Sequence, residues 1–464
     1  MKITLHGAAG EVTGSSYQVQ TEHASVLVDF GLFQGHDLTM GSNAVPRQLD
    51  LAKLDCVILT HAHLDHTGRL PLLAKQGYKG PVYATPASID LTKLILEDSA
   101  KLQEQDAERV SRKRVLHGRP PVEPLYTSED AAAVFEWFQP LPYVTPVKIA
   151  PGISVRMYEA GHILGAASIE MTITEGDKEK VVVFSGDIGP RDAPILRNAA
   201  CLAYADLVLM ESTYGDRDHR SMADTIAEFR QAIMSAVKAK GKILIPTFAV
   251  GRAQVILLQL ARMMEERLIP TIPVILDSPM AIAATRIHAS HPELFDEEMT
   301  REVGRSGFLK HLTIRNSVTA DDSRALNDLV GPCVILAGAG MCDAGRIVHH
   351  LRHNLSLPGT VVMIVGYQSP GSLGRRLVEG EKSVNIFGEP VPVRAAVHSL
   401  GGFSAHAGQT DLLEWFGCLA PKKPRLVLTH GEDRGRIPLA AMIEKRFGIT
   451  ARLPFLGEVI DVLG

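Results

Sequence analysis

Four potential metal ligands lie within six consecutive residues, 61–66, which read His-Ala-His-Leu-Asp-His. An apolar run typical of a β-strand comes directly before them. In an extended backbone His61 and His63 point to the same side, and a turn after them can aim Asp65 and His66 at a neighbouring point. This geometry suits two adjacent metal ions.

The ligand types indicate a catalytic rather than a structural site. Imidazole and carboxylate groups without thiolate favour zinc, with manganese or iron as alternatives, and open positions must remain for water. More ligands are therefore expected from elsewhere, and His162, Asp187 and His430 all stand where strands end in polar, glycine-containing turns. Each alone is often a turn or capping residue, but together with the first cluster they become candidate ligands.

The elements that position these residues fall into two styles. Up to about residue 215 the chain mixes short β-rich runs with polar connections. Helices are expected after Pro86, where Ser88 can cap a run through about Arg114, and from Thr127. From about residue 220 strands and helices alternate, which predicts a parallel sheet. Its strands are expected at 242–246, 273–277, 333–337 and 360–365. The last stretch returns to short β-rich runs and is expected to complete the first domain.

The composition is that of an ordinary globular chain. It has 464 residues, of which 45% are hydrophobic and 22% charged, which is enough for two packed domains. No stretch resembles a signal peptide or approaches the roughly 20 apolar residues of a membrane span, so a cytoplasmic protein without a membrane partner is expected. The net charge of −4 means that a polyanion must be held by a local cationic groove or by metal ions.

The cysteines predict reduced thiols. There are five of them, widely spaced and without a C-x-x-C pattern. An odd total and this spacing fit a reducing compartment better than a disulfide framework.

Taken together, these motifs resemble the metallo-β-lactamase superfamily, and in particular its β-CASP branch of nucleases. Asp29 matches the first superfamily motif and residues 61–66 match the second, while Glu211 to Asp216, Ser404 to His406 and His430 match the motifs specific to the branch. The resemblance covers essentially the whole chain. It implies an α/β fold, an αββα sandwich with an inserted α/β domain that has a mainly parallel sheet. The sandwich is expected at 1–211 and 395–464, and the insertion at 212–394.

The resemblance also assigns the ligands of two zinc ions per chain. One zinc is held by His61, His63 and His162, the other by Asp65, His66 and His430, with Asp187 bridging them and Asp29 in support.

A two-metal site of this kind suits phosphodiester hydrolysis. Two metals about 3.5–4 Å apart lower the pKa of a shared water and clamp both sides of a phosphodiester. The leaving ribose oxygen needs a proton, and by resemblance His406 is the general acid, with Glu211 accepting a hydrogen bond from it. Gly408 stands where members of the branch often carry aspartate, which is expected to loosen the orientation of His406.

Candidate substrate contacts lie in the inserted segment. Gly338 and Gly340 follow a strand and precede a helix, so their backbone N–H groups can cradle a phosphate. Arg252, Arg346 and Arg375 are expected at backbone phosphates because guanidinium matches phosphate geometry, with solvated surface roles as the alternative for each.

The expected function is therefore a zinc-dependent ribonuclease that acts on single-stranded RNA, as an endonuclease or also from a 5′ end. Neither a KH module nor a long C-terminal extension is recognisable in the sequence, so RNA binding is expected to fall to the two domains. The alternatives are a small-ester or thioester hydrolase, a DNA nuclease and an inactive RNA-binding scaffold. A histidine at 406 matches the RNA-acting side of the branch. Whether the protein forms a homodimer is left open.

Overall fold

The computed structural model describes residues 1–35, 42–306, 308–309, 312–368 and 371–463. They pack as two compact units. The first unit joins residues 1–218 to residues 406–464, and the inserted unit comprises residues 219–405.

The first unit contains two seven-stranded sheets. The order in one sheet is β22 (Val459–Asp461), β1 (Lys2–Leu5), β2 (Tyr17–Gln20), β3 (Ser25–Val28), β4 (Cys56–Ile58), β5 (Val82–Ala84) and β6 (Phe138–Pro140). The order in the other is β21 (Ala451–Arg452), β20 (Arg425–Thr429), β11 (Leu207–Glu211), β10 (Lys178–Phe184), β9 (Ala167–Glu175), β8 (Ile153–Glu159) and β7 (Val147–Ala150). Strands from the C-terminal end of the chain thus complete both sheets.

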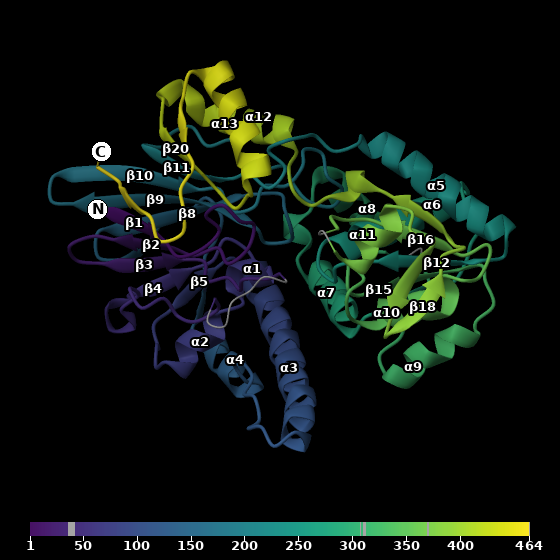
Figure 1. Cartoon of the computed structure of the whole chain (residues 1–464). Coiled ribbons are helices and arrows are strands. Elements are labelled where there is room, and N and C mark those ends of the chain that lie inside the picture. The colour runs from purple at the N-terminus through teal and green to yellow at the C-terminus, as the bar shows by residue number, and fades with distance from the viewer. Residues whose placement is uncertain (36–41, 307, 310–311, 369–370, 464) are drawn as a thin grey trace. The chain divides into compact units, whose positions relative to one another are not determined.

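The two sheets pack face to face over one apolar core. Ile3 and Leu5 from the first sheet and Ile169 and Phe184 from the second are all at most 1% exposed within it. Helices cover the outer faces: α1 (Leu64–Thr67), α2 (Leu70–Lys75), α3 (Pro86–Leu116) and α4 (Ser128–Phe135) on one side, α12 (Gln409–Leu419) and α13 (Asp433–Phe447) on the other (Figure 1). The predicted αββα sandwich is confirmed.

The inserted unit is built on a six-stranded sheet whose described pairs are all parallel. Its order is β14 (Ile314–Asn316), β13 (Val274–Asp277), β15 (Cys333–Ala337), β12 (Lys242–Pro246), β16 (Val361–Ile364) and β19 (Ala396–Ser399). β17 (Ser383–Ile386) and β18 (Glu389–Pro392) form a separate two-stranded antiparallel sheet in the same unit. Its helices are α5 (Met222–Lys238), α6 (Arg252–Glu265), α7 (Pro279–Ser290), α8 (Glu297–Ser306), α9 (Ala320–Ala325), α10 (Arg346–Asn354) and α11 (Leu373–Val378). The predicted parallel sheet is confirmed.

Two local details differ from the sequence expectation. The cap of α3 is Thr85, whose Oγ1 accepts a hydrogen bond from the Ser88 backbone N–H, because Pro86 already stands in the first helical position. Ser88 instead donates to the Gly165 carbonyl oxygen. The return to the first unit lies after residue 405 rather than 394, because β19 pairs with β16 and so belongs to the inserted sheet.

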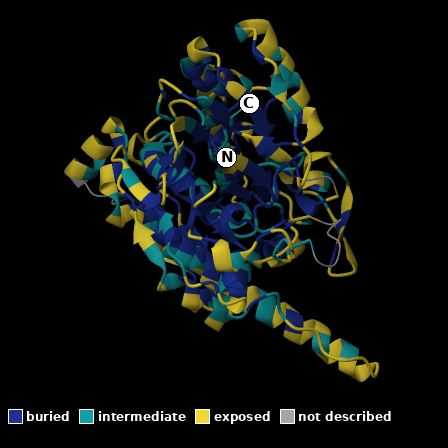
Figure 2. Cartoon of the chain, turned by 90° about the vertical axis from the view of Figure 1, so that its left-hand side faces the viewer, coloured by how far each residue is buried: buried dark blue, intermediate teal, exposed yellow. Residues whose placement is uncertain are grey.

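The long helix α3 is anchored by its first two-thirds only. Its buried residues run from Ala87 to Ala107, and the turns beyond are exposed (Figure 2). None of the helices in the described part of the chain is long and apolar enough to span a membrane.

The expectation that all cysteines are reduced is wrong for one pair. Cys201 and Cys418 form a disulfide across a sequence separation of 217 residues, while Cys56, Cys333 and Cys342 are buried thiols. Sequence spacing could not reveal the pair, because β11 and β20 are neighbours only in the folded sheet, where they bring the segment before β11 close to α12.

We expect reduction of this disulfide to lower the unfolding midpoint of the protein by roughly 4–10 °C, because the bond restricts the unfolded chain by about 2–4 kcal/mol. Scanning calorimetry with and without dithiothreitol measures the change. Cys201→Ser should lower the midpoint by a similar amount and abolish the response to the reductant. Five titratable thiols in protein unfolded without reductant would contradict the bond.

Candidate metal centre and its neighbouring histidine

The expected ligands all stand just beyond the carboxyl ends of strands of the first unit. The segment 61–66 follows β4, His162 follows β8, Asp187 follows β10 and His430 follows β20. His430 adopts a left-handed backbone with φ of 46°, held by its N–H donating to the Ala8 carbonyl oxygen at 2.8 Å. Strand ends therefore turn sharply here, and the turns aim side chains at one point.

Two groups of ligand atoms form around a shared carboxylate. In the first, the His61 Nε2 and His162 Nε2 atoms lie 3.2 and 3.0 Å from His63 Nδ1. In the second, His66 Nε2 lies 3.2 Å from His430 Nε2, and Asp65 Oδ2 lies 3.5 Å from the same His430 atom.

Asp187 reaches both groups. Its Oδ2 atom lies 3.5 Å from both His61 Nε2 and His162 Nε2, and its Oδ1 atom lies 3.3 Å from His66 Nε2. The structure therefore places all seven expected ligands together, with one carboxylate between the two groups.

The residues fit a pair of divalent cations. Asp187 is 2% exposed, and its Oδ1 atom has no hydrogen-bond donor among the described groups. Imidazole nitrogens of the same group also face one another at about hydrogen-bond distance. Buried acceptors without donors are costly, and a cation at each group satisfies them.

Burial sets the protonation states. It lowers the pKa of His63 to about 4 and the pKa of His61 well below its usual value, in each case helped by neighbouring imidazoles. Burial opposes ionisation of Asp187, but His430, His66 and His61 hold its pKa well below its usual value. Neutral imidazole and ionised carboxylate are the forms that bind metal. At His66 burial is outweighed by Asp187 and Asp29, which raise its pKa, so a proton and a cation compete there.

Asp29 orients one ligand from behind. Its Oδ2 atom accepts hydrogen bonds from His66 Nδ1 at 2.7 Å and from Thr60 Oγ1 at 2.8 Å. The Thr60 backbone N–H donates to the other oxygen. These bonds leave His66 Nε2 directed at the centre.

Two threonines with orienting roles were missed at the sequence level. Thr60 contacts Asp29 and also lies 3.1 Å from His61 Nδ1. Thr213 Oγ1 lies 3.1 Å from His430 Nδ1. The available signal was position, since Thr60 directly precedes the cluster and Thr213 lies inside a quoted motif.

His406 lies beside the centre with Glu211 behind it. Its Nδ1 atom is 3.5 Å from Glu211 Oε1 and 3.8 Å from Asp187 Oδ2. Glu211 is buried and accepts from the Ile188 backbone N–H at 2.6 Å, whereas the His406 side chain is 20% exposed. Burial lowers the pKa of His406, but Glu211 and Asp187 outweigh it and raise that pKa above its usual value. Glu211 and Asp187 therefore favour the protonated form of a partly accessible imidazole.

The backbone next to His406 is held despite Gly408. The Ala407 N–H donates to the Ile188 carbonyl oxygen at 2.7 Å, and the Gly408 N–H lies 3.4 Å from Asp411 Oδ2. These contacts act against the loosening expected from a glycine at this position.

The expected phosphate contacts lie in the inserted unit and differ in their surroundings. Arg375 Nε donates to Glu379, the residue directly after α11, and the Arg375 side chain is 45% exposed. Gly338 and Gly340 lie in the loop after β15, and their carbonyl oxygens accept from Ile347 N–H and Gln368 Nε2.

Arg346 is engaged inside the unit. Its Nη1 atom donates to Asp277 Oδ1 at 2.7 Å, and its Nη2 atom donates to the Val318 carbonyl oxygen. Asp277 is fully buried and also accepts from Ser317, Ser323 and His350. This is an anchoring network at the carboxyl end of β13.

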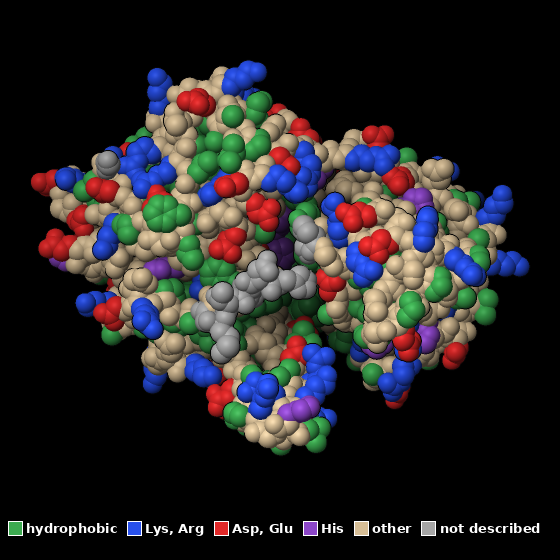
Figure 3. Space-filling view, in the orientation of Figure 1, with side chains coloured by type: hydrophobic (Ala, Val, Ile, Leu, Met, Phe, Trp, Pro, Cys, Tyr) green, Lys and Arg blue, Asp and Glu red, His purple; other side chains and the backbone are tan. Residues whose placement is uncertain are grey.

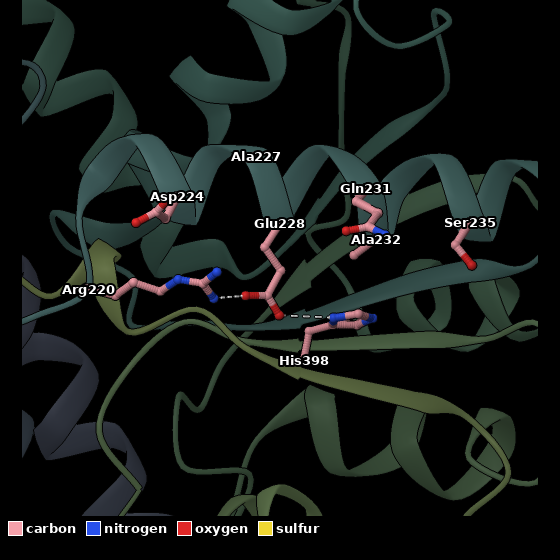
Figure 4. Close-up of a pocket in the computed structure, with 8 residues that line it drawn as sticks. All are labelled: Arg220, Asp224, Ala227, Glu228, Gln231, Ala232, Ser235 and His398. Atoms are coloured by element: carbon pink, nitrogen blue, oxygen red, sulfur yellow. Dashed lines mark hydrogen bonds and ion pairs between the residues drawn. The ribbon is translucent and has the colours of Figure 1, made fainter.

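His398 belongs to the inserted unit, where it lines a cavity of about 550 Å³. Its Nδ1 atom is 3.2 Å from Glu228 of α5, which also pairs with Arg220 (Figure 4). Its contacts are those of a packed, ion-paired side chain.

His63→Ala should remove most bound zinc, because His63 Nδ1 faces both other imidazoles of its group. Changes at residues that only orient a metal ligand typically cost 10–100-fold in metal affinity, and loss of a direct ligand should cost more. Elemental analysis after dialysis measures the metal. His398→Ala is the matched control and should keep the wild-type content; equal content in all three proteins would contradict the assigned centre.

Asp277→Asn should destabilise the inserted unit by about 3–5 kcal/mol, because it leaves Arg346 facing a neutral partner. Burial opposes ionisation, but hydrogen bonds from His350, Ser317, Ser323 and Arg346 hold the pKa of Asp277 far below its usual value. The folded pKa is depressed, so the contribution is present above the ordinary aspartate pKa and is lost as pH falls below it.

Calorimetry from neutral pH to about pH 3.5 should therefore show a gap in unfolding midpoint between the wild type and Asp277→Asn, and this gap should narrow below about pH 4. Asp321→Asn, at an exposed pair with Arg324, should leave the midpoint unchanged. A gap that is constant with pH would rule out the ionised carboxylate as its source.

Three family models match the chain. The metallo-beta-lactamase superfamily model matches residues 9–238, and the Beta-Casp domain model matches residues 253–377. A model described as a Zn-dependent metallo-hydrolase RNA specificity domain matches residues 390–454, which include His406 and His430.

Curated relatives match over nearly the full chain. A Thermus thermophilus protein named as a ribonuclease is 39% identical over 464 residues, covering 100% of both chains. The transcription termination factor FttA of Methanosarcina mazei is 31% identical, covering 97% of this chain and 70% of that protein. The factor of the same name from Methanocaldococcus jannaschii is 30% identical, covering 100% and 72%.

Among solved structures, a protein of unknown function from Enterococcus faecalis V583 matches with a TM-score of 0.55 over 99% of both chains. The identity is 14%, so this likeness concerns the fold alone.

Proposed function

Because the chain belongs to the β-CASP branch of the metallo-β-lactamase superfamily and is a metal-dependent nuclease that acts on RNA, we propose that it cleaves single-stranded RNA internally with two zinc ions. We place this activity in the cytoplasm. The observation that carries the proposal is the Asp187 carboxylate, which lies within 3.5 Å of imidazoles from both ligand groups.

His61, His63 and His162 would hold one cation and Asp65, His66 and His430 the other, with Asp187 shared. When bound, such a pair supplies water activation and neutralises charge on the phosphodiester. The first unit contributes the orientation of these ligands, through Asp29 behind His66 and Thr213 behind His430.

His406 is suited to protonate the leaving ribose oxygen. Its Nδ1 atom faces Glu211, so a protonated ring can give up the proton on Nε2 while Glu211 holds the other. Glu211 acts through His406 and is therefore a positioning residue.

Surface charge does not favour RNA globally. On the visible face, Lys and Arg side chains alternate with Asp and Glu over both units (Figure 3), and the net charge is −4. Recognition of a polyanion then depends on the metal centre and on local contacts.

The observed His406–Glu211 pair favours a nuclease over a small-ester hydrolase, because expulsion of a ribose alkoxide needs an acid. The complete ligand set weighs against an inactive scaffold. Three alternatives remain: cleavage of DNA, attack from a 5′ end and a homodimer. Product mapping on RNA and DNA decides the first two, and sedimentation decides the third.

His406→Ala should lower RNA cleavage by about 10²–10⁴-fold while the protein keeps its zinc, because general acid catalysis is lost and no ligand is removed. End-labelled single-stranded RNA and DNA of one sequence, resolved at nucleotide resolution, measure rate and mode. His117→Ala, at the exposed end of α3, is the control and should cleave normally.

Added imidazole should restore part of the cleavage by His406→Ala, which a purely structural role would not allow. Intact RNA with every metal tried, together with hydrolysis of a thioester, would replace the nuclease proposal with the small-ester alternative.

A further inference from the structure

One aromatic ring is exposed just beyond the carboxyl end of β12 in the inserted unit. Phe248 comes two residues after that strand and is 41% exposed. β12 comes first in the chain among the six strands of the sheet but lies between β15 and β16. The chain order therefore reverses at β12, and ligands of parallel α/β sheets bind beyond the carboxyl ends of strands at such a point.

The ring is held from two sides. The guanidinium carbon of Arg252 lies over it, 5.5 Å from its centroid, and Arg252 Nε is fixed by the Phe403 carbonyl oxygen at 3.1 Å. On another side lies Gly340, where an added Cβ would come within 2.8 Å of Phe248 Cε2. The ring therefore occupies space that only a glycine at position 340 leaves.

Packing does not explain this position. Phe248 is outside the main apolar core of the inserted unit, which β12, β15 and β16 build from other side chains. Single exposed apolar residues are common, and Phe387 at the tip of the β17–β18 hairpin is one, 58% exposed. Phe248 differs because it stands between a cation and the glycine loop that sequence reasoning had assigned to a phosphate.

We infer that Phe248 is a stacking platform for one unpaired nucleobase of the RNA, with Arg252 reinforcing the ring through its cation–π contact. The inference rests on the proposed function for the identity of the ligand. Aromatic rings stack on any base, because every base has a π-face, and arginine adds a cation–π contribution. A base inside a duplex is already stacked and paired, so such a platform selects single strands.

Binding is best measured in the His406→Ala background, where cleavage is slow, by fluorescence anisotropy of short labelled single-stranded RNA. Phe248→Ala should raise Kd by roughly 5- to 100-fold, which corresponds to the loss of one stacked base. Phe248→Tyr should bind like the parent protein, and Phe248→Leu should resemble Phe248→Ala. Phe387→Ala is the matched control and should change nothing.

Two further readouts separate stacking from other roles. RNAs with a single abasic nucleotide at successive positions should lose affinity for the parent protein at one position, and Phe248→Ala should lose nothing more there. The dependence of log Kd on log salt should keep its slope, because no phosphate contact is removed.

Unchanged binding by Phe248→Ala, or full binding by Phe248→Leu, would overturn the platform. Failure of the wild-type protein to bind or cut any RNA would instead overturn the proposed function. If Phe248→Ala cleaves and binds RNA as the wild type does, the platform is wrong while the proposed function stands. The unfolding midpoint of each variant shows whether it is folded.

Discussion

The structure depends on a buried carboxylate that the protein alone leaves without a hydrogen-bond donor on one oxygen. Asp187 is 2% exposed and lies among imidazoles on both sides. Placing an ionised acid there is costly unless positive charge compensates it, and the neighbouring His61 and His63 have pKa values pushed below the usual one by burial. Cations are the compensation that the ligand set fits, and metal binding therefore becomes part of the stability of the first unit as well as of its chemistry.

This constraint explains the organisation of the chain. The centre needs strand ends from before and after the inserted unit, since β11 ends at Glu211 and His430 directly follows its parallel neighbour β20. An insertion between two adjacent parallel strands leaves the first sheet intact while adding a second unit with its own parallel sheet and core. The disulfide between Cys201 and Cys418 joins the same two segments, so the two parts of the first unit are linked covalently as well as by pairing.

The seven candidate ligands that the structure brings together could be identified from the sequence because chemistry and local pattern agree there: polar residues capable of ligation follow apolar strands and share one edge of the fold. Sequence reasoning succeeded for the parallel sheet for the same reason, since regular alternation is a local signal. It failed where the answer is set by tertiary contacts. The disulfide between Cys201 and Cys418 spans 217 residues. The hydrogen bond of Arg346 depends on Asp277, which is distant in the sequence. The exposure of Phe248 depends on how the rest of the inserted unit packs. Thr85 rather than Ser88 caps α3 because Pro86 occupies the first helical position, and this signal is local to the sequence.

The central claim is that two cations share Asp187. Anomalous diffraction above and below the zinc edge, from crystals of the zinc-loaded protein, tests it most directly because it locates metal without reference to activity. If two cations share Asp187, two peaks should lie about 3.5–4 Å apart, both within bonding distance of Asp187. One peak should lie against His61, His63 and His162, and the other against Asp65, His66 and His430. A single peak, or peaks that do not include Asp187, would contradict the claim.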